Sequence, residues 1–212
     1  MRDGHLRDFI RPSTQYKGEK KRMDKNKVLF GLRNVHVAFK GEEGAYDTPK
    51  PVPGAVNLGL SGEGDTETFY ADDIPYFTFS SNNGYTGDLE MAIIPDWFKI
   101  EALGWVKDGN GMVIEVADGE QKPFALLFEV QGDKAKKRYV YYNCNSSKPS
   151  EEHATIEDTR TPQTQTATIT IIPEEIEGKS VVKGSLEMSL ETATAFNAFY
   201  DSVLLPDFTP TP

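Results

Sequence analysis

The amino-acid sequence predicts a mainly β fold, a β-sandwich or barrel of about eight to ten strands with one or two flanking helices and extended arms. Apolar and polar residues alternate over many short segments, which is typical of strands that bury one face. Glycine and proline, present 18 and 13 times among the 212 residues, cluster between these segments as turn formers. Helical spacing of apolar residues is confined to residues 95–104 and 191–203.

Three regions are expected along the chain. Residues 1–22 carry seven Lys and Arg against three Asp and Glu and follow no helical or strand period. We expect them to be a leader that is non-native or disordered, with native translation starting at Met23, because codons for residues 17–20 can form a bacterial ribosome-binding sequence. Residues 23–205 form a single β domain, since a chain of this length is most simply one domain. Residues 206–212 are expected to be a flexible, proline-rich C-terminal tail.

The N-terminal half begins with a predicted strand at residues 28–39, which has one apolar face. A long loop, residues 40–54, follows, because its glycines and prolines block both a helix and the interior of a sheet. Short strands are expected at residues 55–60 and 66–71.

Two longer strands are predicted within residues 76–94, and they meet near Asn82, Asn83 and Gly84. An Asn-Gly step between alternating segments is a hairpin signal. The prediction is therefore a hairpin over residues 76–90.

The first helix is predicted over residues 95–104. Proline is tolerated in the first turn of a helix, and Gly104 is placed to end it. Its expected apolar face consists of Trp97, Ile100 and Leu103.

The C-terminal half is predicted to begin with a long hairpin, residues 124–147, whose two strands are joined by a charged connection. A polar loop or mobile arm follows at residues 148–161. Further strands are expected at residues 164–172 and 181–190, before the second helix at residues 191–203.

The charge balance argues against tight binding of nucleic acid. The chain has 23 Lys and Arg against 33 Asp and Glu, a net charge of −10, whereas affinity for phosphate backbones comes from basic residues. No apolar run approaches the ~18 residues that span a bilayer. We therefore expect no membrane association and a protein that stays in or passes through the cytosol.

Catalytic and metal-binding signatures are missing from the sequence. The chain has three histidines, none at metal-ligand spacing, and neither a P-loop nor a nucleophile elbow. The single cysteine, Cys144, lies in a strand-like segment and is expected to be a buried thiol. We predict no catalytic, metal or cofactor-binding residues, no cofactor, and no enzymatic activity.

An acidic cluster is the one feature that favours an enzyme. A functional reading of the cluster is the carboxylate pair of a glycosidase or a calcium site. The other reading is solvated surface, which is what acidic loops between strands usually are. The cluster consists of Glu63, Asp65, Glu67, Asp72 and Asp73.

Three blocks of the chain resemble the major tail tube proteins of long-tailed (siphovirus-type) bacteriophages. They are residues 26–39, residues 60–98 and residues 136–173, and the resemblance extends from Asp24 to about Val203. It implies a β-sandwich with a helix at its flank, which forms homohexameric rings that stack into the hollow tail tube of the virion. It also implies assembly in the bacterial cytoplasm around a tape-measure protein, with tail terminator and baseplate or distal tail proteins as partners. DNA would pass through the lumen without specific binding, since an acidic wall repels phosphate.

Nine residues are predicted to contact neighbouring subunits: Tyr76, Phe77, Phe79, Asn82, Asn83, Tyr85, Lys134, Lys136 and Lys137. The first six lie in the predicted hairpin, and the lysines lie at the charged tip of the later one. Loop 40–54 is a further candidate. The alternative is that aromatic residues such as Phe69, Phe77 and Phe79 form the core of one subunit, because aromatics on alternating strands usually face inward.

Two other functions fit parts of the pattern. An all-β carbohydrate-binding or adhesin module would use Tyr70, Tyr76 and Tyr85 as a sugar platform and would remain a monomer. The chain could also be the tube protein of a phage-derived injection particle. The same physical arguments apply to such a tube, which differs from a phage tail tube only in what passes through the lumen.

Overall fold

The computed structural model describes residues 30–133, 135–153, 155 and 162–209. The predicted leader, residues 1–22, and Lys134 lie outside the described residues. The fold is mainly β, as predicted, and the described residues form fourteen strands because several short hairpins add to the expected ones.

The main sheet is antiparallel and has eight strands. Seven of them follow the order β2-β1-β9-β10-β11-β6-β3, and β14 pairs with β10 off this path. The strands are β1 (Leu32–Phe39), β2 (Lys50–Pro51), β3 (Ala55–Glu63), β6 (Gly84–Met91), β9 (Phe124–Val130), β10 (Lys137–Ser146), β11 (Gln165–Ile171) and β14 (Lys183–Glu187).

The remaining strands form three separate two-stranded hairpins. These are β4 (Thr66–Ala71) with β5 (Ile74–Ser80), β7 (Val106–Lys107) with β8 (Val113–Ile114), and β12 (Glu174–Ile176) with β13 (Lys179–Val181). The helices are α1 (Asp96–Leu103), α2 (Ala193–Asn197) and the 3₁₀ turn η1 (Ala198–Tyr200).

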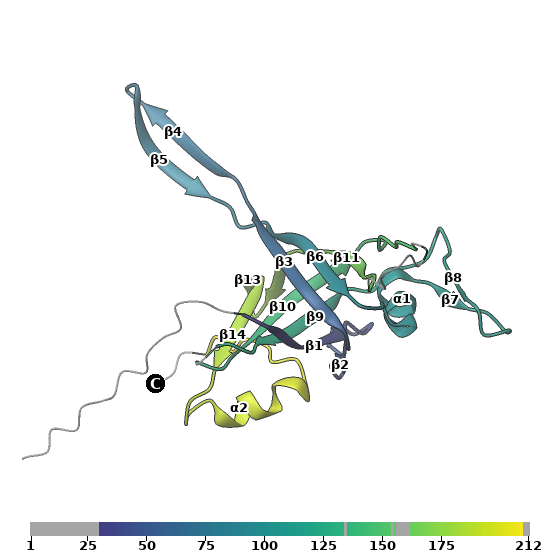
Figure 1. The fold of residues 1–212 in the computed structure, drawn as a ribbon. Coiled ribbons are helices and arrows are strands. Elements are labelled where there is room, and N and C mark those ends of the chain that lie inside the picture. Colours follow the sequence, from purple (N-terminus) through teal and green to yellow (C-terminus); the bar gives the residue numbers. More distant parts are fainter. Residues whose placement is uncertain (1–29, 134, 154, 156–161, 210–212) are drawn as a thin grey trace, which may run out of the picture.

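The main sheet curls until its two ends face each other. In Figure 1, β3 crosses in front of β1 and β9, although β3 and β1 are not hydrogen-bonded neighbours. The result is a partly open barrel, with α1 at one end and α2 outside the sheet below β14 (Figure 1). The β4–β5 hairpin continues beyond the end of β3 and leaves the body.

Strand β9 lies inside the sheet, between β1 and β10, and is buried on both faces. Phe124, Leu126 and Phe128 belong to the main core inside the curled sheet. Ala125 and Leu127 belong to a second cluster that packs against the C-terminal helical segment. The run of apolar residues in β9 therefore serves two cores, because successive side chains of a strand point to opposite faces.

A bulge in β10 lets this strand pair with three others. Its register with β9 shifts between Tyr141 and Cys144, and Asn143 in the bulge has a φ of 48°. Before the bulge β10 pairs with β14, and after it β10 pairs with β11. An extra residue in one strand bends it and changes its partners, which is how the branched sheet arises.

Tyr46 ties loop 40–54 to the bulge. Its hydroxyl accepts a hydrogen bond from the backbone nitrogen of Asn143 at 3.1 Å and donates one to the carboxylate of Glu174. Lys40 pairs with the same carboxylate at 2.5 Å. Within this loop, Pro51 lies in a two-residue strand at the edge of the sheet, a position where proline is tolerated.

Helix α1 confirms the first predicted helix. Pro95 precedes it in an extended conformation, and Gly104 follows it with a φ of 71°. A Cβ atom on Gly104 would lie 2.5 Å from the backbone nitrogen of Glu120, so the close approach also requires glycine. The predicted apolar face was partly wrong, because the fully buried side chains are Phe98 and Ala102 rather than Trp97 and Ile100.

The second predicted helix is shorter than expected. Helix α2 and the 3₁₀ turn η1 cover residues 193–200 and bury Phe196 and Phe199. Arg138 fixes this segment on the sheet, with its guanidinium 4.0 Å from the ring centroid of Phe196 and 4.7 Å from that of Tyr200. A guanidinium between aromatic rings is a cation–π contact worth about 0.5–2 kcal/mol.

The chain beyond η1 lies against the second cluster. The Tyr142 hydroxyl donates a hydrogen bond to the carbonyl oxygen of Leu204 at 2.6 Å, and Lys179 lies 4.0 Å above the ring of Phe208. The flexibility expected for residues 206–212 stays a prediction.

We predict that Phe98→Ala destabilises the body by about 3–5 kcal/mol, because Phe98 is fully buried against the rings of Phe39 and Phe124. Urea unfolding followed by tryptophan fluorescence measures the loss. Leu190→Ala is the matched control, since Leu190 is fully exposed. Equal effects of the two substitutions would contradict the assigned core.

Candidate assembly surface

We define the arm as residues 64–81, which contain the β4–β5 hairpin. It projects away from the body as a thin two-stranded ribbon (Figure 1). Its strands pair only with each other among the described strands. An isolated two-stranded hairpin has marginal stability in water, so the arm needs a further surface to become rigid.

The arm turns at Asp72 and Asp73, which have φ values of 51° and 61°. Two consecutive left-handed residues form the type I′ turn that suits the twist of a two-residue hairpin, and aspartate tolerates this conformation. The predicted hairpin over residues 76–90 was therefore wrong, because β5 pairs with β4, whereas β6 pairs with β3 and β11.

Asn82 and Asn83 lie at the root of the arm. The backbone nitrogen of Asn83 donates to the carbonyl oxygen of Glu63 at 2.8 Å, across the same ladder that β3 forms with β6. Gly84 does not serve a turn. A Cβ atom there would lie 1.9 Å from the carbonyl oxygen of Ile171, so glycine is required by the close approach of β11.

Large apolar side chains are exposed along the whole arm. Their exposed fractions are 61% for Phe69, 62% for Tyr70, 60% for Ile74, 73% for Tyr76, 60% for Phe77 and 49% for Phe79. The alternative that Phe69, Phe77 and Phe79 form the core of one subunit is therefore wrong. Two pairs of these rings contact each other, Phe69 with Tyr76 and Phe77 with Phe79.

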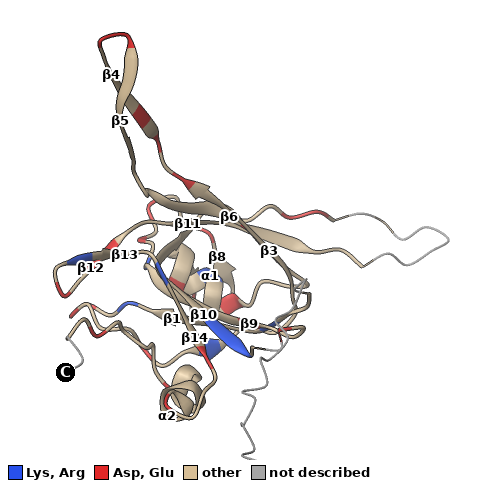
Figure 2. Cartoon of the chain, turned by 90° about the vertical axis from the view of Figure 1, so that its left-hand side faces the viewer, with Lys and Arg blue, Asp and Glu red and all other residues tan. Residues whose placement is uncertain are grey.

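The arm is also uniformly acidic. No Lys or Arg occurs between Lys50 and Lys99. Figure 2 shows acidic and no basic segments on the arm. Five carboxylates lie on it or at its root, and none forms an ion pair in the described structure: Glu63, Asp65, Glu67, Asp72 and Asp73.

The other predicted interface residues lie on the body. Tyr85 is half-buried, 5.5 Å from the ring centroid of Tyr141 and beneath the amino group of Lys183. Lys136 is exposed in the β9–β10 turn, and Lys137 forms an ion pair with Glu187 at 3.4 Å. The structure thus places Tyr76, Phe77 and Phe79 on the arm and the lysines at a separate turn.

The sugar platform of the carbohydrate-binding alternative is not assembled. Tyr70 and Tyr76 lie near the tip of the arm, whereas Tyr85 pairs with Gly62 in the body. A sugar platform needs aromatic faces on one continuous surface.

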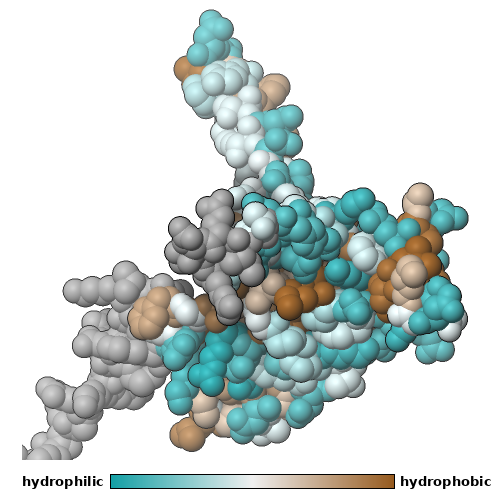
Figure 3. All heavy atoms as spheres, turned by 45° about the vertical axis from the view of Figure 1, so that its right-hand side comes forward, coloured by the Kyte–Doolittle hydropathy of each residue, from teal (hydrophilic) through white to brown (hydrophobic). Residues whose placement is uncertain are grey.

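A second exposed apolar surface was missed by the sequence prediction. It lies on β7–β8 and beside it, where the exposed fractions are 71% for Ile93, 50% for Val106, 61% for Met112 and 37% for Ile114. Figure 3 shows apolar atoms gathered at this end of the molecule. The sequence pattern did not show that these side chains stay uncovered by the rest of the described chain.

The carboxylates do not form a cleft with catalytic or ligand geometry. Among the described residues no group of three or more His, Cys, Asp or Glu side chains is arranged to hold a metal ion. Asp108 closes its own turn, and hydrogen bonds from the backbone of Met112, followed by the side chain and backbone of Asn110, lower the pKa of its carboxyl. In the described part of the chain, neither helix has the length and apolar character of a membrane span.

The sequence matches no family model and no curated protein. Among solved structures, the chain is similar to the tube-terminating cap of the anti-feeding prophage, at 10% identity and a TM-score of 0.45, over 80% of this chain and 100% of that one. It is also similar to the sheath/tube terminator of an extracellular contractile injection system (PVC) in its extended state, at 10% identity and a TM-score of 0.43, over 76% of this chain and 98% of that one. The sheath–tube complex of the same system matches at 11% identity and a TM-score of 0.42, over 76% of this chain and 94% of that one. At scores this low, the likenesses carry no argument about function.

We predict that the native Cys144 thiol does not react with a thiol-specific reagent at pH 8. The side chain is fully buried, and this burial raises the pKa of the thiol well above its usual range, so the thiolate is not populated. The reaction rate should rise to that of a free thiol when the protein is unfolded in urea. Fast reaction in the folded state would show that the core around β10 opens.

We also predict that the body folds without the arm. Replacing residues 66–80 by Asn-Gly joins Asp65 to Ser81, which already share a backbone hydrogen bond of 2.8 Å, through a two-residue turn. The free energy of unfolding of the monomer should change by no more than about 0.5 kcal/mol, as for surface changes. A loss of several kcal/mol in urea unfolding would show that the arm packs on its own body.

Proposed function

We propose that this chain is a structural tube subunit of a tail-like particle, which assembles with copies of itself through the arm. The arm is the observation that carries the proposal. Its aromatic side chains are exposed, and its position beyond β3 keeps them off the body of the same chain (Figure 1).

The energetics favour coverage of the arm by another molecule. Burying one large apolar side chain contributes about 1.5–3 kcal/mol. The arm offers several such side chains on a ribbon that is marginal alone, so association stabilises both the contact and the hairpin. Coverage by an identical subunit requires no further component.

The geometry of an arm favours a repeating assembly. A projecting ribbon that docks on a different surface of the next copy makes a heterologous contact, and such contacts generate closed rings or filaments. The resemblance of residues 26–39, 60–98 and 136–173 to siphovirus tail tube proteins gives the finer form, homohexameric rings that stack into a tube.

The charge supports the same proposal. A net charge of −10 gives a wall that repels phosphate, so DNA can slide through a lumen without adhering. A tape-measure protein in the lumen, together with tail terminator and baseplate or distal tail proteins at the ends, completes the particle in this proposal. Assembly takes place in the cytoplasm of the bacterial host.

The test is assembly of the full chain at high concentration. Negative-stain microscopy and sedimentation velocity should show rings or tubes for the native sequence. The double variant Tyr76→Ser/Phe77→Ser should remain a folded monomer, because it removes the two neighbouring exposed rings of β5.

Leu190→Ser is the matched control, since Leu190 is also exposed but lies outside the arm and outside the β7–β8 surface, between β14 and α2. This variant should assemble like the native chain. A native chain that stays monomeric at every concentration and salt, or an arm variant that assembles normally, contradicts the proposed function.

A further inference from the structure

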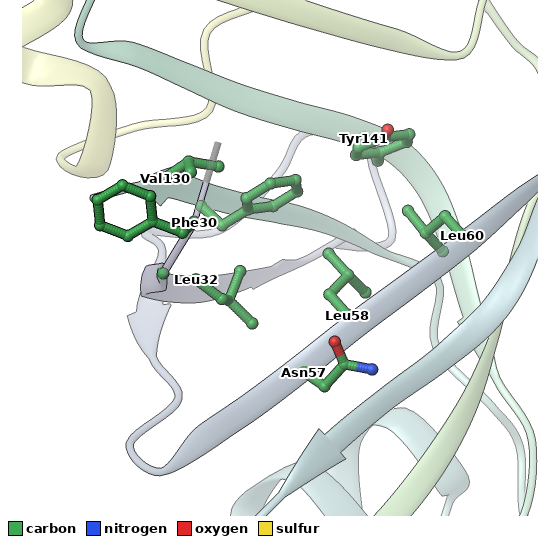
Figure 4. Close-up of a pocket in the computed structure, with 9 residues that line it drawn as sticks. Phe30, Leu32, Asn57, Leu58, Leu60, Val130 and Tyr141 are labelled. Carbon is green, nitrogen blue, oxygen red and sulfur yellow. The ribbon is translucent and has the colours of Figure 1, made fainter. Parts of the chain in front are cut away.

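An apolar groove opens on the body where the curled sheet fails to close. It has a volume of about 380 Å³ and lies between β1 and β9 on one side and β3 on the other. In Figure 4, Leu58 and Leu60 of β3 face Leu32 and Tyr141 across this space. Val130 and the exposed Phe30 lie at one end of it (Figure 4).

The groove exists because the barrel is incomplete. Strand β3 pairs with β6 on one side, and no described strand pairs with it on the other. An extended ribbon laid along this side would meet both an apolar floor and a free strand edge.

One cation lies beside the groove without a carboxylate partner in the described structure. Lys183 holds its amino group 4.6 Å from the ring centroid of Tyr85 and 5.7 Å from that of Tyr141. The groove therefore combines an apolar floor with a positive charge near Tyr141.

We propose that this groove receives the arm of a second copy of the chain. The arm has the complementary properties: exposed aromatic rings, extended backbone, and acidic side chains with no basic residue among them. Its own groove is out of reach, because the arm points away from the body (Figure 1). The inference rests on the proposed function and names the surface that completes the contact.

The direct test is cross-linking between two single-cysteine additions. One chain carries Tyr76→Cys on the arm, the other carries Leu58→Cys in the groove, and the two are mixed under mild oxidation. The buried Cys144 is common to both chains, and the unsubstituted chain measures its background. Intact mass identifies the mixed disulfide dimer.

The mixed dimer should form in at least about ten-fold higher yield than in a control mixture of Tyr76→Cys with Met112→Cys. Docking raises the local thiol concentration from the micromolar value of free chains toward the millimolar range. Equal yields in the two mixtures overturn the proposal. So does a dominant dimer of Tyr76→Cys with itself, because arms would then pair with each other.

A charge reversal gives a second readout. Lys183→Glu in the chain with Leu58→Cys should lower the cross-link yield several-fold, because it brings a like charge toward the acidic arm. Lys107→Glu is the control, since Lys107 lies on β7 away from the groove. An unchanged yield for Lys183→Glu, with an unchanged unfolding midpoint, contradicts the electrostatic part of the contact.

Microscopy of the native chain separates failure of this inference from failure of the proposed function. Tubes without the arm–groove cross-link leave the tube function standing and overturn the groove as its receiver. Cross-linked chains that never form rings or tubes support the contact and overturn the tube. If neither the cross-link nor any ring or tube is observed, both the inference and the proposed function are overturned.

Discussion

The aromatic side chains of the arm pack on one another but are not covered by the described part of the body, and the account of this protein depends on that constraint. The two core clusters of the body contain none of them. Its core is formed by β9 and the strands around it, and the arm leaves at Glu63 and Gly84 beyond the last contact with β11. A folded domain that keeps large rings exposed at a distance from its core presents them to another molecule.

The body gives the arm a fixed base. Strands β3 and β6 pair along eight registered positions and then continue directly into the arm, so the base of the arm inherits the direction of the sheet. Gly84 permits the close approach of Ile171 at this base. The second cluster, which includes Phe199, packs against the opposite face of β9 and β10. A docking element gains affinity when its base is held in place, because less freedom is lost on association.

Local signals predicted the elements well. Pro95 and Gly104 delimited α1, and the alternation within residues 124–147 gave the β9–β10 hairpin.

The errors arose where a residue serves a distant neighbour. The Asn-Asn-Gly step resembled a hairpin turn, but its glycine is required by β11, and the turn lies instead at two aspartates. Alternation marked the arm as strands but did not tell whether either face is covered, because that depends on the topology of the whole chain. The sequence pattern did not predict the groove for the same reason, because its walls come from strands that are distant in the sequence.

Hydrogen exchange of the arm as a function of protein concentration tests the central claim most directly. The account predicts that backbone amides of residues 66–80 exchange rapidly in the dilute monomer and become protected at high concentration, together with the amides on the unpaired edge of β3 beside the groove. The body amides of β9 should remain protected throughout. Arm amides that exchange at the same rate at every concentration would contradict the account, because the arm would then have no partner in a second copy.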